Sequence, residues 1–141
     1  MKYTTLIFDA FDTVVHINRA RLPTCRINGS LIRTTAPALH DALGDFGIRS
    51  AFETVIVSDE VGWRKPHRII FEQTFERMKI RPSEALFIGD QLYVDVYGAL
   101  NAGMDVVWLE TEEQDWLIPE IPEPTYKARS IIEVIELLEK I

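Results

Sequence analysis

Charged side chains stand at the ends of several apolar runs in this sequence. Asp9 and Asp90 each close such a run, and Asp95 comes five residues after Asp90. Lys65 stands directly before a proline, at the start of a further segment. A carboxylate at the end of a strand can act as a nucleophile or bind a metal ion, and Mg²⁺ prefers oxygen ligands. We therefore expect one site in which Mg²⁺ and a lysine offset the charge of a phosphoryl group.

The interpretation depends on the set of residues and not on any single one. An aspartate after a strand is more often part of a turn or a helix cap, and a single lysine is usually a solvated surface charge. Asp9 and Asp90 would hold the ion, and Asp95 would bind it or hold its water shell. Lys65 would face a phosphoryl oxygen and Asp9.

The expected elements would bring these residues to one edge of a sheet. Apolar patterns predict strands over residues 4–8, 54–57, 85–89 and 104–110, and helices over residues 36–47, 66–78, 91–103 and 130–141. Strands and helices alternate from residue 54 onward, which predicts a parallel sheet with helices on both faces. In such sheets the ligand binds outside the carboxyl ends of the strands, where Asp9, Ser58 and Asp90 fall.

Two connecting segments complete the expected organisation. Asn28 and Gly29 lie between two short runs, which predicts a small β-hairpin over residues 24–33. Residues 111–127 contain three prolines and several acidic side chains, which is typical of a surface loop.

The composition restricts the class of protein. The chain has 141 residues, of which 47% are hydrophobic and 26% charged, as expected for one ordinary globular domain. It contains no apolar run of the ~20 residues that cross a bilayer and no signal-peptide pattern. The single cysteine fits a reducing cytoplasm. A net charge of −7 argues against nucleic acid as a partner. We expect a cytoplasmic protein that binds neither nucleic acid nor membrane.

Three stretches together resemble the haloacid dehalogenase (HAD) superfamily of hydrolases. They are DAFDT at residues 9–13, VSDEVGWRKPHRIIFE at residues 57–72 and ALFIGDQLYVDVYGALNAGM at residues 85–104. The resemblance implies an α/β fold with a three-layer α/β/α, Rossmann-like arrangement. It also implies that Asp9 is the nucleophile that attacks phosphorus, Lys65 the charge-stabilising lysine, and Asp90 the metal ligand supported by Asp95. Thr13 is expected to fix the turn after Asp9, and we include it among the catalytic residues.

Phe11 departs from the pattern of the family's phosphatases. These usually carry a second aspartate two residues after the nucleophile, as general acid and base. Asp12 is no simple substitute, because successive side chains of a strand point to opposite faces. Loss of a general acid–base costs ~10²–10⁴-fold in rate. The resemblance implies that the backbone carbonyl at this position binds the metal, and Phe11 keeps that carbonyl.

The second departure is the length of the chain before the lysine. Only about forty residues separate Thr13 from the strand at 54–57, which leaves no room for the family's cap domain. We expect a single HAD-like core over residues 1–141, with the hairpin as a small flap. The phosphate-binding hydroxyl is then Ser58, if residues 54–57 lie beside the first strand, with Thr34 and Thr35 as alternatives. A missing central strand would leave an open edge, which favours a homodimer.

Three functions follow from these observations. The first is an Mg²⁺-dependent phosphatase that forms an aspartyl-phosphate at Asp9 and acts on a small phosphorylated substrate or a phosphorylated macromolecule. The second is a dehalogenase-type hydrolase, because haloacid dehalogenases also carry an aromatic residue at the position of Phe11 and need no Mg²⁺. The third is a catalytically impaired HAD-like module for binding or oligomerisation.

Overall fold

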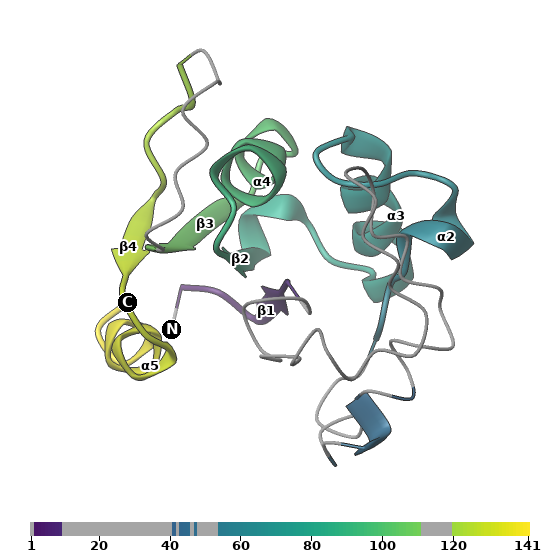
Figure 1. Cartoon of the computed structure of the whole chain (residues 1–141). Coiled ribbons are helices and arrows are strands. Elements are labelled where there is room, and N and C mark those ends of the chain that lie inside the picture. The colour runs from purple at the N-terminus through teal and green to yellow at the C-terminus, as the bar shows by residue number, and fades with distance from the viewer. Residues whose placement is uncertain (1, 10–40, 42, 46, 48–53, 111–119) are drawn as a thin grey trace, which may run out of the picture.

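The computed structural model describes residues 2–9, 41, 43–45, 47, 54–110 and 120–141 (Figure 1). The hairpin predicted over residues 24–33 lies outside these residues, as do Phe11, Asp12, Thr13, Thr34 and Thr35. Within the helix predicted over residues 36–47, residues 41 and 43–45 are helical.

The core of the described fold is a sheet of four parallel strands in the order β1-β2-β3-β4. The strands are β1 (Thr5–Phe8), β2 (Ala85–Gly89), β3 (Asp105–Leu109) and β4 (Tyr126–Ala128). The register pairs Phe8 with Ile88 and Gly89 with Trp108. The parallel sheet predicted from the alternation of elements is therefore confirmed.

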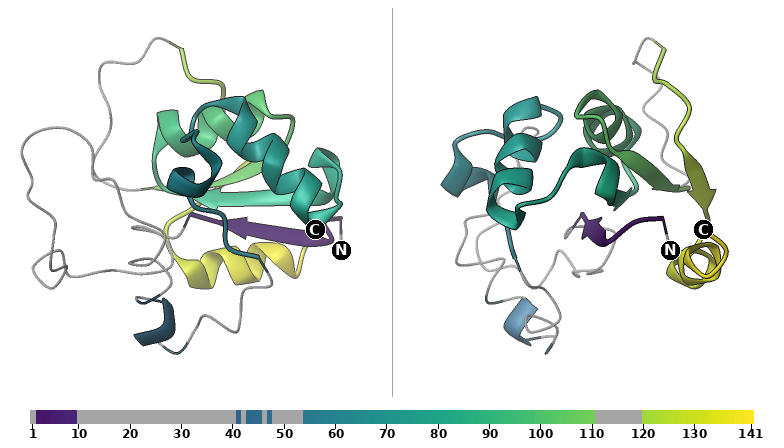
Figure 2. Two further views of the ribbon diagram at one scale, coloured as in Figure 1. Left: turned by 90° about the vertical axis from the view of Figure 1, so that its right-hand side faces the viewer. Right: turned by 180° about the vertical axis from the view of Figure 1, so that it is seen from behind.

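Helices cover both faces of this sheet, which gives the predicted three layers (Figures 1 and 2). One face packs against α3 (Arg68–Met78), η4 (Leu92–Tyr97) and α4 (Gly98–Asn101) through Phe71, Phe87 and Val96, among others. The other face packs against α5 (Ile131–Leu138) through Leu86, Val107 and Val134. Because both faces are buried, β2 is apolar along its whole length and none of its residues is exposed.

Side chains cap the two longest helices. The Nδ1 atom of His67 accepts a hydrogen bond from the Ile69 N–H at 3.4 Å, at the start of α3. The Ser130 hydroxyl accepts one from the Glu133 N–H at 3.2 Å, at the start of α5. Each cap satisfies a backbone donor that has no partner within its helix, and so defines where the helix begins.

No helix among the described residues is long and apolar enough to span a bilayer.

The structure corrects three of the predicted elements. Residues 54–57, predicted as a strand, are not part of the described sheet and lead directly into α2 (Ser58–Val61). The backbone of Val57 is extended, but an extended segment forms a strand only when it is hydrogen-bonded to a neighbouring strand. The predicted loop 111–127 ends too late, because Tyr126 and Lys127 pair with β3 as part of β4. The helix predicted over 91–103 begins as a π-helical turn, η4, in which the Val96 N–H reaches the carbonyl of Gln91 at 3.2 Å.

A polar network joins β1, β3 and β4 at the amino ends of the strands. Asp105 Oδ2 accepts hydrogen bonds from the Tyr3 hydroxyl at 2.6 Å and the Lys2 ammonium at 2.9 Å, and Oδ1 accepts one from Thr125 at 3.2 Å. Burial would raise the pKa of the Asp105 carboxyl, but the hydrogen bonds from Tyr3 and Lys2 outweigh burial and hold the pKa below its usual value.

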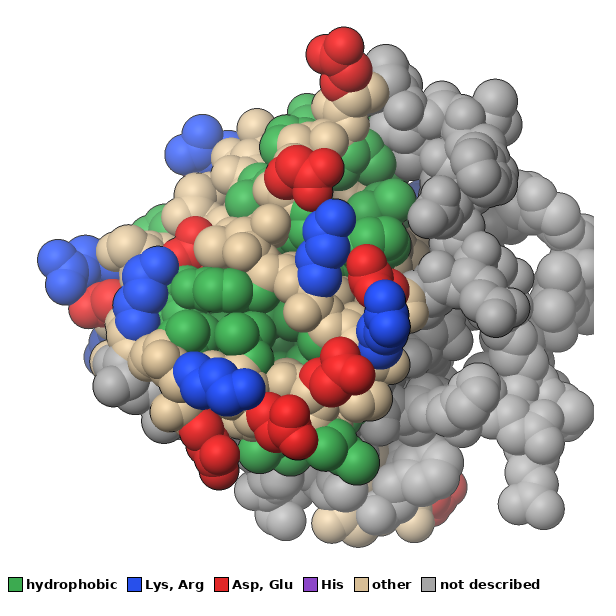
Figure 3. Space-filling model, turned by 90° about the vertical axis from the view of Figure 1, so that its left-hand side faces the viewer, with side chains coloured by type: hydrophobic (Ala, Val, Ile, Leu, Met, Phe, Trp, Pro, Cys, Tyr) green, Lys and Arg blue, Asp and Glu red, His purple; other side chains and the backbone are tan. Residues whose placement is uncertain are grey.

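The side of the molecule that carries β4 and α5 has a mixed surface. Acidic and basic side chains alternate there, with hydrophobic side chains visible between them (Figure 3).

Asp105→Asn should lower the free energy of unfolding at pH 7 by about 0.5–1 kcal/mol, because the side chain is partly exposed to solvent. Since the folded-state pKa lies below the ordinary 3.8, the carboxylate's contribution is complete above that pH. It is lost as the pH falls through the folded pKa. Urea denaturation of both proteins between pH 7 and pH 2 should therefore show the difference shrinking in acid. Glu136→Gln, on the exposed side of α5, is the control; an equal pH dependence there would contradict the prediction.

Candidate functional site

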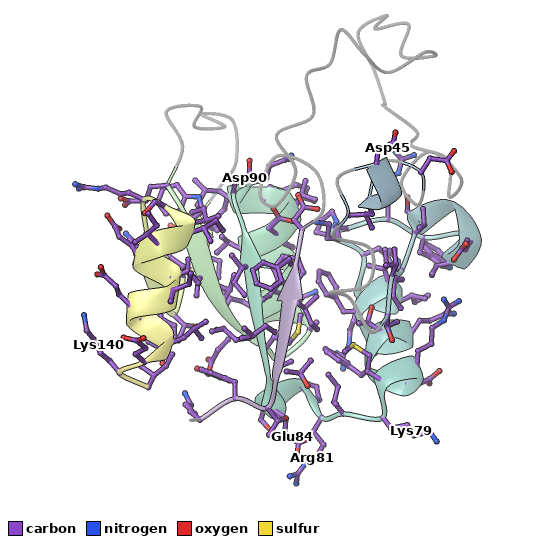
Figure 4. The ribbon with its side chains drawn as sticks, turned by 90° about the horizontal axis from the view of Figure 1, so that it is seen from below. Asp45, Lys79, Arg81, Glu84, Asp90 and Lys140 are labelled. Carbon is purple, nitrogen blue, oxygen red and sulfur yellow. The ribbon has the colours of Figure 1, made fainter. Side chains whose placement is uncertain are left out.

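The carboxyl ends of β1 and β2 bring Asp9 and Asp90 to the same edge of the sheet. Asp9 directly follows β1 and Asp90 directly follows β2, and the Asp9 N–H donates to the Ile88 carbonyl at 2.9 Å. Figure 4 shows Asp90 at the end toward which both strands point, with Arg81 and Glu84 at the opposite end. Side chains alternate between the two faces of a strand, so Asp9 is expected on the same face as Ile7, two residues earlier. Ile7 packs against the core cluster that α3 and η4 cover. The Asp9 carboxylate is therefore expected on that side of the sheet.

Lys65 reaches this edge from the turn between α2 and α3. Its ammonium donates to Asp9 Oδ1 at 2.8 Å and to Asp95 Oδ1 at 2.5 Å. It also lies over the ring of Phe87, 5.2 Å from the centroid. Burial alone would lower the pKa of Lys65, but the carboxylates of Asp95 and Asp9 outweigh it and hold the pKa above its usual value. Lys65 is therefore a permanent positive charge in the site.

Asp95 organises the turn that carries Asp90. Its carboxylate has no exposed surface, and Oδ2 accepts the backbone N–H groups of Asp90 at 3.2 Å and Gln91 at 3.1 Å. The other oxygen accepts the Lys65 ammonium. Three donors therefore fix the orientation of the Asp95 carboxylate, and two of them are the backbone N–H groups of the turn from which the Asp90 side chain projects.

Two glycines permit this close arrangement. A Cβ atom at Gly89 would lie 2.6 Å from Cβ, Cγ and Oδ2 of Asp95, so only glycine fits beside that buried carboxylate. A Cβ atom at Gly98 would lie 2.9 Å from the ring of Phe71 and 3.2 Å from the Cα atom of Pro66. Glycine at position 98 thus lets the helix after η4 approach the turn that carries Lys65.

The donor set fits a hard divalent cation. Asp9, Asp90 and Asp95 each offer a carboxylate oxygen, and these oxygens lie within 4.8 Å of one another. Three carboxylates against the one ammonium of Lys65 leave two formal negative charges, which a divalent ion would balance. Because both oxygens of Asp95 already accept protein donors, Asp9 and Asp90 are the better direct ligands, with Asp95 holding them in place.

The structure brings together four of the residues that the sequence predicted for the site: Asp9, Lys65, Asp90 and Asp95. Ser58, the predicted phosphate-binding residue, is the first residue of α2 and does not follow a strand. It takes no part in the hydrogen bonds that join Lys65 to Asp9 and Asp95. Phe11 and Thr13 lie outside the described residues, so their assignments stay predictions.

Trp108 is a neighbour of the site that the sequence did not single out. Its indole N–H donates to the backbone carbonyl of Asp90 at 2.8 Å. The available signal was its position, because a residue at the carboxyl end of β3 lies at the same edge as Asp9 and Asp90.

Comparison with a protein-family model gives a match over more than half of the chain. The model described as haloacid dehalogenase-like hydrolase matches residues 33–109. This range contains Lys65, Asp90 and Asp95.

Individual relatives agree with this match. The chain is 34% identical over 120 residues to a glyceraldehyde 3-phosphate phosphatase of Pyrococcus furiosus, covering 77% of this chain and 45% of the relative. It is 34% identical over 95 residues to the pyrimidine 5'-nucleotidase YjjG of Escherichia coli, covering 67% of this chain and 41% of the relative. The chain therefore spans less than half the length of these curated relatives.

A solved structure shares the arrangement of elements. The HAD-hydrolase YfnB from Bacillus subtilis, in a crystal form bound to magnesium, superposes with a TM-score of 0.65 at 30% identity. The superposition covers 74% of this chain and 46% of that one.

Asp95→Asn should lower the free energy of unfolding by about 3 kcal/mol, because it breaks a buried ion pair and leaves Lys65 with a single carboxylate. The control is Glu72→Gln, which breaks a solvent-exposed ion pair: the side chain of Glu72 is 47% exposed and that of Arg68 is 62% exposed. This variant should lower the free energy of unfolding by only about 0.3–0.5 kcal/mol. Urea denaturation at pH 7 measures both values. Similar losses in the two variants would show that Asp95 does not hold this edge of the sheet together.

Proposed function

Since the chain belongs to the haloacid dehalogenase-like hydrolases, we propose that it is an Mg²⁺-dependent phosphatase that forms an aspartyl-phosphate at Asp9. The observation that carries the proposal is the group of three carboxylates around the Lys65 ammonium at the carboxyl edge of the sheet. A site with both a cation and room for a divalent ion suits a phosphate monoester, whose charge must be offset before an anion can attack it.

The first chemical step assigns the nucleophile. An oxygen of the Asp9 carboxylate attacks phosphorus, an Asp9–phosphorus bond forms, and the bond from phosphorus to the substrate oxygen breaks. The Lys65 ammonium, 2.8 Å from Asp9 Oδ1, would stabilise the charge on the phosphoryl oxygens. When bound between Asp9 and Asp90, Mg²⁺ would act as a Lewis acid on a phosphoryl oxygen.

The second step is hydrolysis of the aspartyl-phosphate. A water molecule attacks phosphorus, inorganic phosphate leaves, and the Asp9 carboxylate is regenerated. The side chain of Phe11 provides neither a proton for the leaving oxygen nor a base for this water. We expect solvent to do both, and the rate to depend strongly on how well the leaving group departs as an anion.

The proposed substrate is a small phosphate monoester. Relatives that share 34% identity are named for a triose phosphate and for nucleotides, and more than half of each relative's length lies outside the matched region. A cytoplasmic location stays a prediction from the single cysteine.

Asp9→Asn should abolish Mg²⁺-dependent hydrolysis of p-nitrophenyl phosphate, because an amide cannot act as the nucleophile. The assay measures p-nitrophenol release with Mg²⁺ and with EDTA, and circular dichroism checks that the variant is folded. Glu72→Gln, which removes an exposed carboxylate from α3, should retain full activity. Hydrolysis of a 2-haloacid that needs Asp9 but no Mg²⁺ would favour the dehalogenase, and no turnover by the folded wild-type protein would favour the binding module.

Phe11→Asp should raise the rate on phosphate monoesters with poor leaving groups by about 10²-fold or more, since it supplies the absent general acid–base. The effect should be much smaller on p-nitrophenyl phosphate, whose leaving group departs as an anion without a proton. Steady-state kinetics on an alkyl phosphate and on the aryl phosphate give the two ratios. Phe11→Asn has a similar shape and no acid, so an equal gain from it would contradict the assigned role of position 11.

A further inference from the structure

Trp108 lies where it can control the direction of the Asp90 side chain. In the parallel register of β2 and β3, Trp108 is the partner of Gly89, the residue directly before Asp90. Its indole N–H donates to the Asp90 carbonyl at 2.8 Å, and the side chain is almost fully buried, with 7% of its surface exposed. A donor in such surroundings is not readily replaced by water.

The indole ring is itself held in place. On one side it belongs to the core cluster that contains Phe87, Val96 and Ala99. The ammonium of Lys127, its partner in β4, lies 5.7 Å from the ring centroid. Contacts with the core and with β4 therefore make the ring a rigid anchor.

The backbone of Asp90 is consequently held from both ends of the residue. The carbonyl accepts the Trp108 indole N–H, and the N–H group donates to Asp95 Oδ2 at 3.2 Å. Once both backbone groups are fixed, the carboxylate can move only by rotation of its own side chain. From this geometry we infer that Trp108 is a positioning residue that orients Asp90 toward the cation shared with Asp9.

The inference rests on the proposed Mg²⁺ site and concerns the affinity of that site. Removal of a group that orients a metal ligand weakens metal binding without removing a ligand. Loss of the indole N–H should therefore raise the dissociation constant for Mg²⁺ about threefold to thirtyfold. Turnover at saturating Mg²⁺ should change by less than about threefold, because Asp9 and Lys65 are untouched.

The experiment compares Trp108→Phe with Trp63→Phe by isothermal titration of Mg²⁺ into the substrate-free protein. Phenylalanine at position 108 keeps an aromatic ring in the core and lacks the N–H donor. Trp63 is 45% exposed and stacks on His67, with ring centroids 3.9 Å apart, so its replacement removes a tryptophan of no assigned role at the metal. We expect weaker Mg²⁺ binding from Trp108→Phe alone, with Trp63→Phe within twofold of the wild-type protein.

A second variant separates the hydrogen bond from the packing of the ring. β-(3-Benzothienyl)alanine at position 108 has sulfur in place of the indole N–H and keeps the two-ring shape, so it should weaken Mg²⁺ binding as Trp108→Phe does. If circular dichroism shows that Trp108→Phe is unfolded, the benzothienylalanine variant alone tests whether the indole N–H strengthens Mg²⁺ binding. Wild-type affinity in this variant would overturn the inference. No Mg²⁺ binding by the wild-type protein would instead overturn the proposed metal site, which distinguishes the two failures.

Discussion

The Lys65 ammonium between Asp9 and Asp95 is the interaction on which the rest of this site depends. The oxygens of three carboxylates lie within 4.8 Å of one another, and their mutual repulsion would be large where little water screens it. Lys65 bonds to two of them, at 2.8 Å and 2.5 Å, and so allows the acidic residues to be gathered at one edge. The negative charge that remains is the charge that the proposed divalent cation would balance.

The fold supplies this interaction with partners from three separate segments. Asp9 comes from β1, Asp95 from the π-helical turn after β2, and Lys65 from the turn before α3. These segments meet because the sheet is parallel and covered on both faces, and because Gly89 and Gly98 leave space where any side chain would collide. The network around Asp105 ties β1 to β3 and β4 at the amino ends of these strands. β1 is thus held at both ends, by the Tyr3–Asp105 hydrogen bond at one and by the Asp9–Lys65 ion pair at the other.

Much of the fold and of the site was predictable from the sequence, for identifiable reasons. The runs before Asp9 and Asp90 are uninterrupted and apolar, as strands buried on both faces must be, and their ends were predicted to within a residue. The run at residues 54–57 looks the same in sequence, but pairing depends on a neighbour that local pattern does not specify. β4 was missed because its three residues, Tyr126–Ala128, are too few for a periodic signal. The bond from Trp108 to Asp90 was missed because it joins residues whose proximity follows only from the register of β2 and β3.

The sequence by itself determined the residue types that come together at this edge of the sheet: the carboxylates of Asp9, Asp90 and Asp95 and the ammonium of Lys65. Those identities set the charges that this edge can present to a cation or a phosphoryl group. The tertiary structure decided how the carboxylates divide their work. From sequence spacing, Asp95 could either bind the metal ion or hold its water shell. In the structure one oxygen of Asp95 accepts the Lys65 ammonium, and the other accepts the backbone N–H groups of Asp90 and Gln91. That difference comes from burial and from hydrogen-bond geometry, which exist only once the distant segments have packed together.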